Sequence, residues 1–236
     1  MSLEKNYRES KLENLKQLVT LSNFCLPIDQ IPCRHLTSNM YAWRCDQLVW
    51  AVDAGDASAL LDYVGLNDQL AGVFITHAHY DHIMGLNELA AAFPDCLFYA
   101  SDYTIAGIRS TKMNLSFYHE MPFEYHGDQC LTMPAQGVVL PNGFGVVVGL
   151  PSPGHNEGAL IFRFHQHFFT GDSFIPGIPV VTKLKSGNKQ QNIETLRTLR
   201  SSFQNDAQIH PGHGPEMMAH DLRDEHFPDL LKHPYM

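Results

Sequence analysis

The sequence Thr-His-Ala-His-Tyr-Asp-His occupies residues 76–82 and places three imidazoles and a carboxylate within six consecutive positions. An apolar run with β-branched and aromatic residues, at 72–76, leads into this stretch and predicts a buried strand. Helical spacing of apolar residues follows over 82–93 and stops before Pro94. The cluster therefore lies on a predicted strand-to-helix turn, the usual place for a functional site in an α/β protein.

The spacing within this stretch predicts two binding positions. Side chains alternate along an extended chain, so His77 and His79 point the same way. Asp81 and His82 lie past the bend and can reach a second point nearby. Imidazole is the commonest metal ligand, and carboxylate suits the same divalent cations. We therefore interpret the cluster as a metal site rather than as a group of hydrogen-bonded or solvent-facing histidines.

Three further motifs place a glycine beside a candidate ligand at the end of a predicted strand, where the backbone must turn sharply. They are Gly154-His155, Gly171-Asp172 and Pro211-Gly212-His213-Gly214. Together with residues 77–82, and in the same order, these motifs resemble the signature of the metallo-β-lactamase fold superfamily. An early Asp53-x-Gly55 after an apolar run resembles the first motif of that family.

The resemblance implies two metal sites with every expected ligand present. It implies a first site of His77, His79 and His155, a second site of Asp81, His82 and His213, and Asp172 as the carboxylate that bridges them. It also implies that Asp81 orients the nucleophile and passes a proton to the leaving group. Asp53 matches a position from which a carboxylate orients a ligand histidine through its other ring nitrogen.

The order of predicted elements indicates an α/β (α+β) protein with two sheets packed face to face and helices on both outer sides. The resemblance implies the same four-layer αββα sandwich. We expect a single domain over residues 1–236, with an N-terminal helix at about 4–22 and a C-terminal helical tail at about 216–236. Strands are predicted at 46–53, 70–76, 97–100, 137–140, 144–150, 159–164, 167–172 and 206–210, and helices at 56–66, 82–93, 102–110, 191–204 and within 216–232.

Composition describes an ordinary globular enzyme. The chain has 236 residues, of which 44% are hydrophobic and 17% charged, enough for a substantial core. A formal net charge of −9 argues against nucleic acid as a partner. No stretch approaches the length of a membrane span, and the charged N-terminus has no apolar signal region. The five cysteines are odd in number and dispersed, as in a reducing compartment, so we expect a cytoplasmic protein without membrane association.

The expected chemistry is hydrolysis of an ester-like bond in a small molecule. Two divalent ions, most simply Zn²⁺ with Fe or Mn as alternatives, would supply a hydroxide nucleophile at neutral pH and polarise the substrate oxygen. The ligand set leaves thioester, lactone and related bonds open. Glyoxalase II-like and lactonase-like members resemble the chain in ligand set, although the short stretch after His213 does not match the extension with which glyoxalase II enzymes hold glutathione.

Substrate contacts are expected outside the metal motifs. The segment after Asp172 is the most basic short stretch in the acidic body of the chain, with Lys183, Lys185 and Lys189. These lysines are candidates for binding an anionic group, or are simply solvated. Tyr80 could donate a hydrogen bond to a substrate oxygen. The apolar segment 113–125 could form a wall over the metals or belong to the core.

Two other functions remain open. One is a mononuclear iron oxidoreductase of the persulfide dioxygenase type, which uses only the first histidine set and a carboxylate. The other is a metal-bound regulator without catalysis. The remaining histidines have simpler interpretations: His165 and His167 flank a predicted hairpin turn, and His210 lies at a strand end. The oligomeric state does not follow from the sequence.

Overall fold

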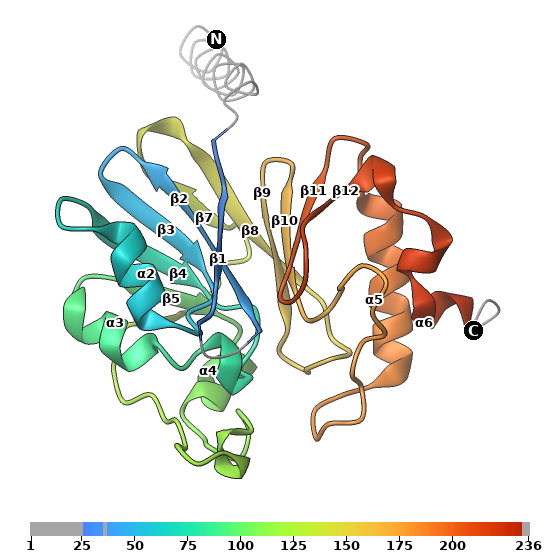
Figure 1. The fold of residues 1–236 in the computed structure, drawn as a ribbon, viewed down its shortest axis with the longest axis horizontal. Coiled ribbons are helices and arrows are strands. Elements are labelled where there is room, and N and C mark those ends of the chain that lie inside the picture. Colours follow the sequence, from blue (N-terminus) through green and yellow to red (C-terminus); the bar gives the residue numbers. More distant parts are fainter. Residues whose placement is uncertain (1–25, 35–36, 233–236) are drawn as a thin grey trace, which may run out of the picture.

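The computed structural model describes residues 26–34 and 37–232, so the helix predicted at 4–22 lies outside the described residues. Within this part of the chain, the strands form two six-stranded sheets that face each other (Figure 1). Helices cover the outer face of each sheet. The observed architecture is the predicted α/β sandwich of four layers.

The first sheet has the strand order β1-β2-β3-β4-β5-β6. Neighbours from β1 to β3 are antiparallel, and those from β3 to β6 are parallel. Its strands are β1 (Asp29–Pro32), β2 (Asn39–Cys45), β3 (Leu48–Val52), β4 (Gln69–Phe74), β5 (Leu97–Ala100) and β6 (Cys130–Thr132). The outer face carries α2 (Ala57–Val64), α3 (Leu86–Ala92) and α4 (Asp102–Ile108).

The second sheet has the order β12-β11-β10-β9-β8-β7 and is antiparallel except between β10 and β11. Its strands are β7 (Val138–Leu140), β8 (Gly145–Pro151), β9 (Leu160–Phe164), β10 (His167–Gly171), β11 (Gln208–Pro211) and β12 (Met217–Met218). Its outer face packs against α5 (Lys189–Ser202) and α6 (Pro228–Leu231), which lie on the right in Figure 1.

Aromatic side chains fill the space between the two sheets. Trp43 of the first sheet stacks on Phe164 and Phe169 of the second, with ring centroids 5.1 and 5.6 Å apart. Phe74 and Phe162 meet in the same layer at 5.3 Å. Burying such large rings is worth a few kcal/mol each, so this layer fixes the distance between the sheets.

Both faces of the central strands are buried, which explains their continuous apolar runs. In β3, Val49 and Ala51 pack toward the helices, whereas Trp50 and Val52 pack toward the other sheet. The predicted strand and helix positions agree with the structure over most of the chain. The sequence prediction missed β1, β2 and the short strands β6 and β12.

The helix predicted at 82–93 is interrupted. A 3₁₀ turn, η1 (Tyr80–His82), is followed by a loop, and α3 begins only at Leu86. The backbone here is bonded to the neighbouring loop as well as within the turn: Ala54 donates to the carbonyl of His82 at 2.7 Å, and Gly85 donates to the carbonyl of Ala54 at 2.7 Å. These bonds fix the turn that carries the ligand candidates.

The predicted helical tail over 216–236 differs from the structure. It begins with strand β12, which pairs with β11, and continues through the 3₁₀ turns η4 (Ala219–Asp221) and η5 (Asp224–His226) before the four-residue α6. Short apolar runs such as Met217–Met218 do not reveal by periodicity whether they are strand or helix. Among the described residues, no helix has the length and apolar character needed to cross a bilayer.

Candidate metal centre

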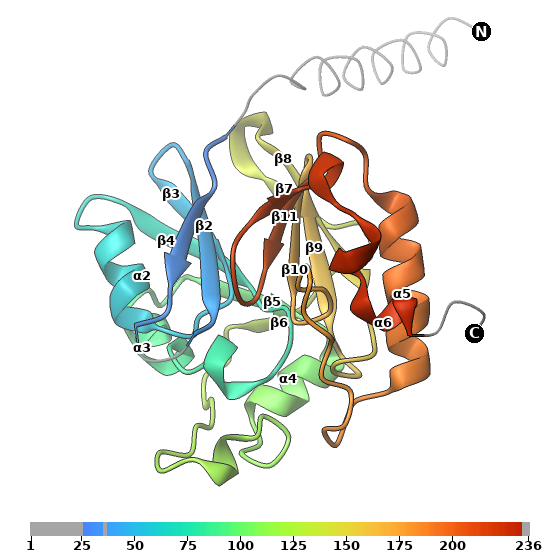
Figure 2. The ribbon, with the colours of Figure 1, turned by 45° about the vertical axis from the view of Figure 1, so that its right-hand side comes forward.

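The candidate ligands gather at one end of the sandwich, on loops that leave both sheets (Figure 2). His77 and His79 follow β4, and Asp81 and His82 lie in or beside η1. The second sheet contributes the others: His155 from the β8–β9 loop, Asp172 directly after β10 and His213 after β11. The seven residues that the sequence singled out therefore meet in space and divide into two groups.

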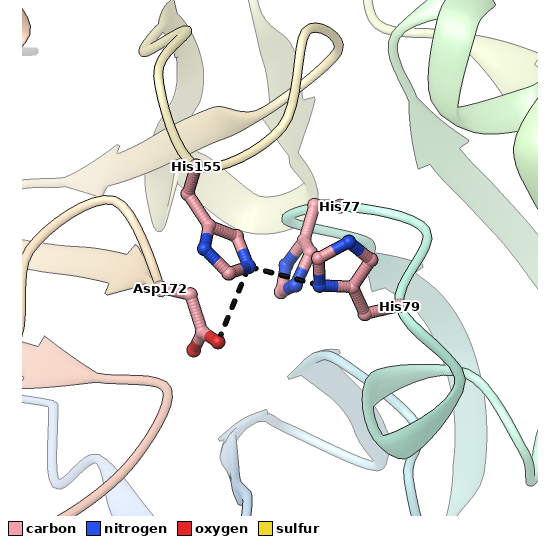
Figure 3. Close-up of side chains that lie close together, drawn as sticks. All are labelled: His77, His79, His155 and Asp172. Carbon is pink, nitrogen blue, oxygen red and sulfur yellow. Dashed lines mark hydrogen bonds and ion pairs between the residues drawn. The ribbon is translucent and has the colours of Figure 1, made fainter. Parts of the chain in front are cut away.

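The first group contains His77, His79, His155 and Asp172, whose candidate ligand atoms lie within 4.8 Å of one another. Figure 3 shows the three rings facing one another beside the carboxylate. His155 Nε2 lies 2.9 Å from His79 Nδ1 and 3.4 Å from Asp172 Oδ2. Four donors of the kinds that bind zinc or iron thus converge on one point.

Hydrogen bonds on the outer sides of the rings set their tautomers. His155 Nδ1 donates to the carbonyl of Val181 at 2.9 Å, so in the neutral ring Nε2 carries the lone pair. Thr76 Oγ1 donates to Asp53 at 2.8 Å and accepts from His77 Nδ1 at 3.0 Å. The lone pair of His77 Nε2 therefore also faces the group.

The second group contains Asp81, His82 and His213. His213 Nε2 lies 3.3 Å from Asp81 Oδ2, and His82 Nε2 lies 3.6 Å from the same oxygen. His213 Nδ1 donates to the carbonyl of Thr37 at 3.0 Å, so Nε2 faces Asp81 and can bind a cation that replaces its proton. This group has the composition of a second metal position.

Asp172 lies between the two groups and offers one oxygen to each. Its Oδ1 is 3.4 Å from His82 Nε2 and 3.6 Å from His213 Nε2, whereas its Oδ2 faces His155. A carboxylate in this position can bind two cations at once. The geometry suits a bridging ligand.

Asp53 orients the ligand turn from behind. It is buried at 2% exposure and has a φ of 61°, a left-handed conformation that is uncommon outside glycine. Its Oδ1 accepts from the backbone of Thr76 at 2.8 Å, and its Oδ2 accepts from His82 Nδ1 at 2.8 Å. Since this bond takes the proton on His82 Nδ1, the lone pair of Nε2 points at the second group.

Three buried polar atoms in the centre have no hydrogen-bond partner: His77 Nε2, His82 Nε2 and Asp172 Oδ1. An unsatisfied buried polar atom costs about 1–3 kcal/mol, and three of them facing one another are unusual. Cations bound by these atoms would remove that cost. The residues present therefore fit a metal centre.

The protonation states of the candidate ligand histidines are also compatible with cation binding. Burial, reinforced by the charge of His155, lowers the pKa of His79 to about 3, and burial holds the pKa of His77 well below its usual value. Both rings are neutral at pH 7, as metal ligands must be. Burial opposes a charge on His82, but the carboxylates of Asp81 and Asp172 outweigh burial and raise its pKa well above the ordinary value. A bound metal would replace that proton.

Two glycines permit the close approach of the ligand loops. Gly171 has a φ of 48°, and a Cβ there would lie 2.7 Å from Thr76 Oγ1. A Cβ on Gly212 would lie 2.4 Å from Asp172 Oδ1 and 2.9 Å from His82 Cε1. Glycine is thus required by space at both positions, and at Gly171 by backbone conformation as well.

The candidate substrate-binding residues differ in whether they line a cavity beside the ligand groups. Lys183 and Lys185 are both exposed, but Lys185 lines a small cavity beside His79, together with Met113, and Lys183 does not. Tyr80 lies partly exposed and stacks on His119 at 3.8 Å between ring centroids.

The apolar segment 113–125 is divided between several environments. Met113 lines the cavity, Phe123 and Tyr125 belong to the core, and Phe117 is exposed. Leu115, which the sequence did not single out, also lines the cavity. Thr76 and Thr37 were missed too, because a threonine that holds a histidine by hydrogen bonding has no distinctive sequence pattern.

The histidines at 165, 167 and 210 lie apart from the two groups. His165 has a φ of 53° at the β9–β10 turn, as expected for a hairpin. His167 Nδ1 and His210 Nε2 lie 2.9 Å apart, and His210 Nδ1 lies 2.6 Å from Glu216 Oε1. His210 is thus hydrogen-bonded in the interior, and none of these contacts reaches a candidate ligand.

Comparison with known proteins identifies related chains. The family model of the metallo-beta-lactamase superfamily matches residues 52–227, which include every candidate ligand. A curated protein of Streptococcus pyogenes serotype M6, named "Probable metallo-hydrolase", is 30% identical over 189 residues, which cover 75% of this chain and 79% of that protein. A hydroxyacylglutathione hydrolase of Tolumonas auensis is 26% identical over 192 residues.

The match to that hydroxyacylglutathione hydrolase covers 80% of this chain but only 65% of the relative's length. Among solved structures, the BLEG-1 B3 metallo-beta-lactamase superposes with a TM-score of 0.73 at 20% identity, covering 88% of this chain and 97% of the other. At that identity the superposition establishes a shared fold.

Proposed function

The chain belongs to the metallo-beta-lactamase superfamily, and from that premise we propose that it is a dinuclear metallo-hydrolase that cleaves an ester-like bond, a thioester or lactone, in a small molecule. The named relatives are hydrolases, which supports the reaction class. The dinuclear mechanism and the bond type are the further steps proposed here.

The observation that carries the proposal is the position of Asp172 between two complete ligand groups. Each of its oxygens faces a different group, and the partnerless atoms His77 Nε2 and His82 Nε2 face the same space. Two divalent ions held there, most simply Zn²⁺, would supply Lewis acidity and a water of lowered pKa. The donors, five histidines and two carboxylates, are those expected for zinc or iron rather than for Ca²⁺ or Mg²⁺.

Asp81 is the residue proposed to handle the proton. Burial raises the pKa of its carboxyl group, but the charge of His82 and the hydrogen bond from His213 leave it below the usual value. Asp81 is therefore ionised at neutral pH. Its side chain keeps 20% exposure at the open side of the site, so it can accept a proton from the attacking water and return it to the leaving group.

The second group favours hydrolysis over the mononuclear iron oxidoreductase. That alternative requires only His77, His79, His155 and a carboxylate, and gives no role to Asp81, His82 and His213. In this chain His82 is held by Asp53 in the tautomer that a ligand needs. A purely structural role would not require such orientation.

Metal analysis combined with a substrate panel tests the proposal. We expect about two ions per chain and turnover of thioesters or lactones that is lost on chelation and restored by Zn²⁺, with little turnover of phosphodiesters. One iron per chain with oxygen uptake would establish the oxidoreductase instead. Full metal content without hydrolysis of any ester, thioester or lactone would support a regulator.

A further inference from the structure

A cavity of about 120 Å³ adjoins the first ligand group. His79 forms one side of it, and the remaining lining residues are Tyr103, Met113, Leu115, Leu184, Lys185 and Ser186. A larger cavity of about 570 Å³ lies between α5 and the second sheet, but none of the candidate ligands lines it. The smaller cavity thus adjoins a candidate ligand, and a substrate bound at the metal centre can enter it.

One wall of the cavity, residues 113–115, is bonded to the ligand turn. Tyr80 donates its backbone N–H to the carbonyl of Asn114 at 3.0 Å. The buried Asn114 side chain accepts from the backbone of Ser116 at 2.9 Å and donates to the carbonyl of Phe123 at 2.9 Å. These bonds hold Leu115 at a φ of 68°, which is rare for a bulky residue.

The opposite wall, residues 184–186, is bonded to the His155 loop. The Asn156 side chain donates to Ser186 Oγ at 3.0 Å, and Asn188 donates its backbone N–H to the carbonyl of Gly154 at 2.7 Å. The bond from His155 Nδ1 to the carbonyl of Val181 adds a third link. Both walls are therefore fixed relative to the ligands, and a group that binds between them loses little energy to rearrangement.

The lining combines apolar surface with a single cation. Methionine, two leucines and a tyrosine ring suit a short hydrocarbon chain. Among the described residues that line the cavity, Lys185 is the only charged side chain apart from histidine, and none is acidic. Lys183 is also exposed, but it does not contribute to the lining.

Building on the proposed function, we propose that this cavity binds the acyl arm of the substrate, a short apolar chain whose far end carries an anionic group bound by Lys185. The scissile carbonyl then lies over the ligand groups, and the leaving group points away from His79. The substrate class is an ester, thioester or lactone of a short dicarboxylic or similarly anionic acid.

Matched thioesters test this assignment in the metal-loaded protein. Acetyl, pentanoyl and glutaryl thioesters of N-acetylcysteamine share a neutral leaving group, and glutaryl differs from pentanoyl by a carboxylate in place of the terminal methyl. We expect Lys185→Gln to lower kcat/KM for the glutaryl thioester about tenfold, equal to about 1.4 kcal/mol, and to change the pentanoyl value less than about twofold. Lys183→Gln, the matched control, is expected to change neither.

A second variant tests the apolar part. Leu184→Trp is expected to lower kcat/KM for the pentanoyl thioester about tenfold relative to the acetyl thioester, because the indole fills the cavity. Ile178→Trp, in the same loop but outside the lining, serves as control. Metal content of all variants is expected to equal that of the wild type.

Calorimetry with glutarate and pentanoate provides a readout that does not depend on turnover. The cavity assignment is supported if the wild type binds glutarate more tightly than pentanoate and this preference is lost in Lys185→Gln but retained in Lys183→Gln. If the preference is seen but no thioester is hydrolysed, the cavity assignment stands and only the proposed function fails. Equal effects of the two lysine substitutions on glutaryl turnover and glutarate binding would overturn the assignment, while hydrolysis of the panel would leave the proposed function intact.

Discussion

Replacing Asp53 by asparagine tests the most specific claim about the metal centre. Asparagine tolerates the left-handed backbone that Asp53 adopts, so the change removes a charge without adding backbone strain. Asp53 Oδ2 accepts from both Thr76 Oγ1 and His82 Nδ1 at 2.8 Å. Asparagine offers one acceptor oxygen where the carboxylate offers two. If its NH₂ group faces His82, Nδ1 meets a donor and the ring favours the tautomer with its proton on Nε2, the atom that should bind metal. If the NH₂ group faces the backbone N–H of Thr76, the ligand turn loses that hydrogen bond, and in both orientations His82 loses the negative charge that orients it.

The expected loss of metal affinity follows from the loss of the Asp53 carboxylate. Loss of the carboxylate that orients a ligand histidine typically weakens metal binding 10–100-fold, or about 1.4–2.8 kcal/mol. His77 should also be affected, because Thr76 links it to Asp53. We expect both ions to be bound more weakly, and the ion of the second group more so.

Competition with a chromophoric chelator measures the affinity directly. Asp56→Asn is the matched control, since Asp56 is a buried carboxylate that caps α2 by accepting from the backbone of Ala59 at 3.0 Å and also accepts from the backbone of Arg34 at 2.8 Å. It is expected to lower stability without changing metal affinity. Wild-type affinity in Asp53→Asn, or the same loss of affinity in both variants, would refute the tautomer argument.

Five further changes have defined outcomes. His79→Ala and Asp172→Asn should lower metal content and hydrolysis together, and normal turnover in either would contradict the ligand assignment. Gly212→Ala should cause loss of metal measured by elemental analysis, because its Cβ would lie 2.4 Å from Asp172 Oδ1. Removal of metal at pH 7 should lower the free energy of unfolding by about 4 kcal/mol for an ion present at 1,000 times its Kd, measured by urea denaturation. Burial, followed by the charge of His210, lowers the pKa of His167 to about 4. Between pH 6.5 and 4 the unfolded chain therefore binds this proton more readily than the folded chain does, so the free energy of unfolding falls as pH falls. Between pH 7 and 5 the free energy of unfolding of the wild type should fall by about 2 kcal/mol more than that of His167→Asn. Equal losses in the two proteins would show that His167 does not titrate in this way.

The ligand candidates and the layered fold could be predicted because their signals are local. Residues 77–82 follow an apolar strand, and each later ligand adjoins a glycine at a strand end. Such patterns depend on a few neighbouring residues, so the chain alone shows them. The four-layer arrangement follows from the order of strands and helices.

Other features could not be predicted because they arise from long-range contacts. The difference between Lys183 and Lys185 depends on which way one loop turns against the His155 loop. Leu115 reaches the cavity because Asn114 holds an unusual backbone conformation. Strands β6 and β12 are short and lie at sheet edges, where pairing with a distant strand, more than intrinsic preference, determines the conformation.

The ligands come from opposite sheets: the first sheet carries His77 to His82, and the second carries His155, Asp172 and His213. The separation of the two halves of the centre is therefore set by the thickness of the aromatic layer between the sheets. Close-packed interiors transmit small displacements instead of absorbing them. A change of ring size in this layer, for example at Phe162, would alter the distances between ligands within each metal position, because each group takes ligands from both sheets. The packing between the sheets thus determines the geometry of the metal centre, and substitutions in that core can change the reactivity of the centre without replacing a ligand.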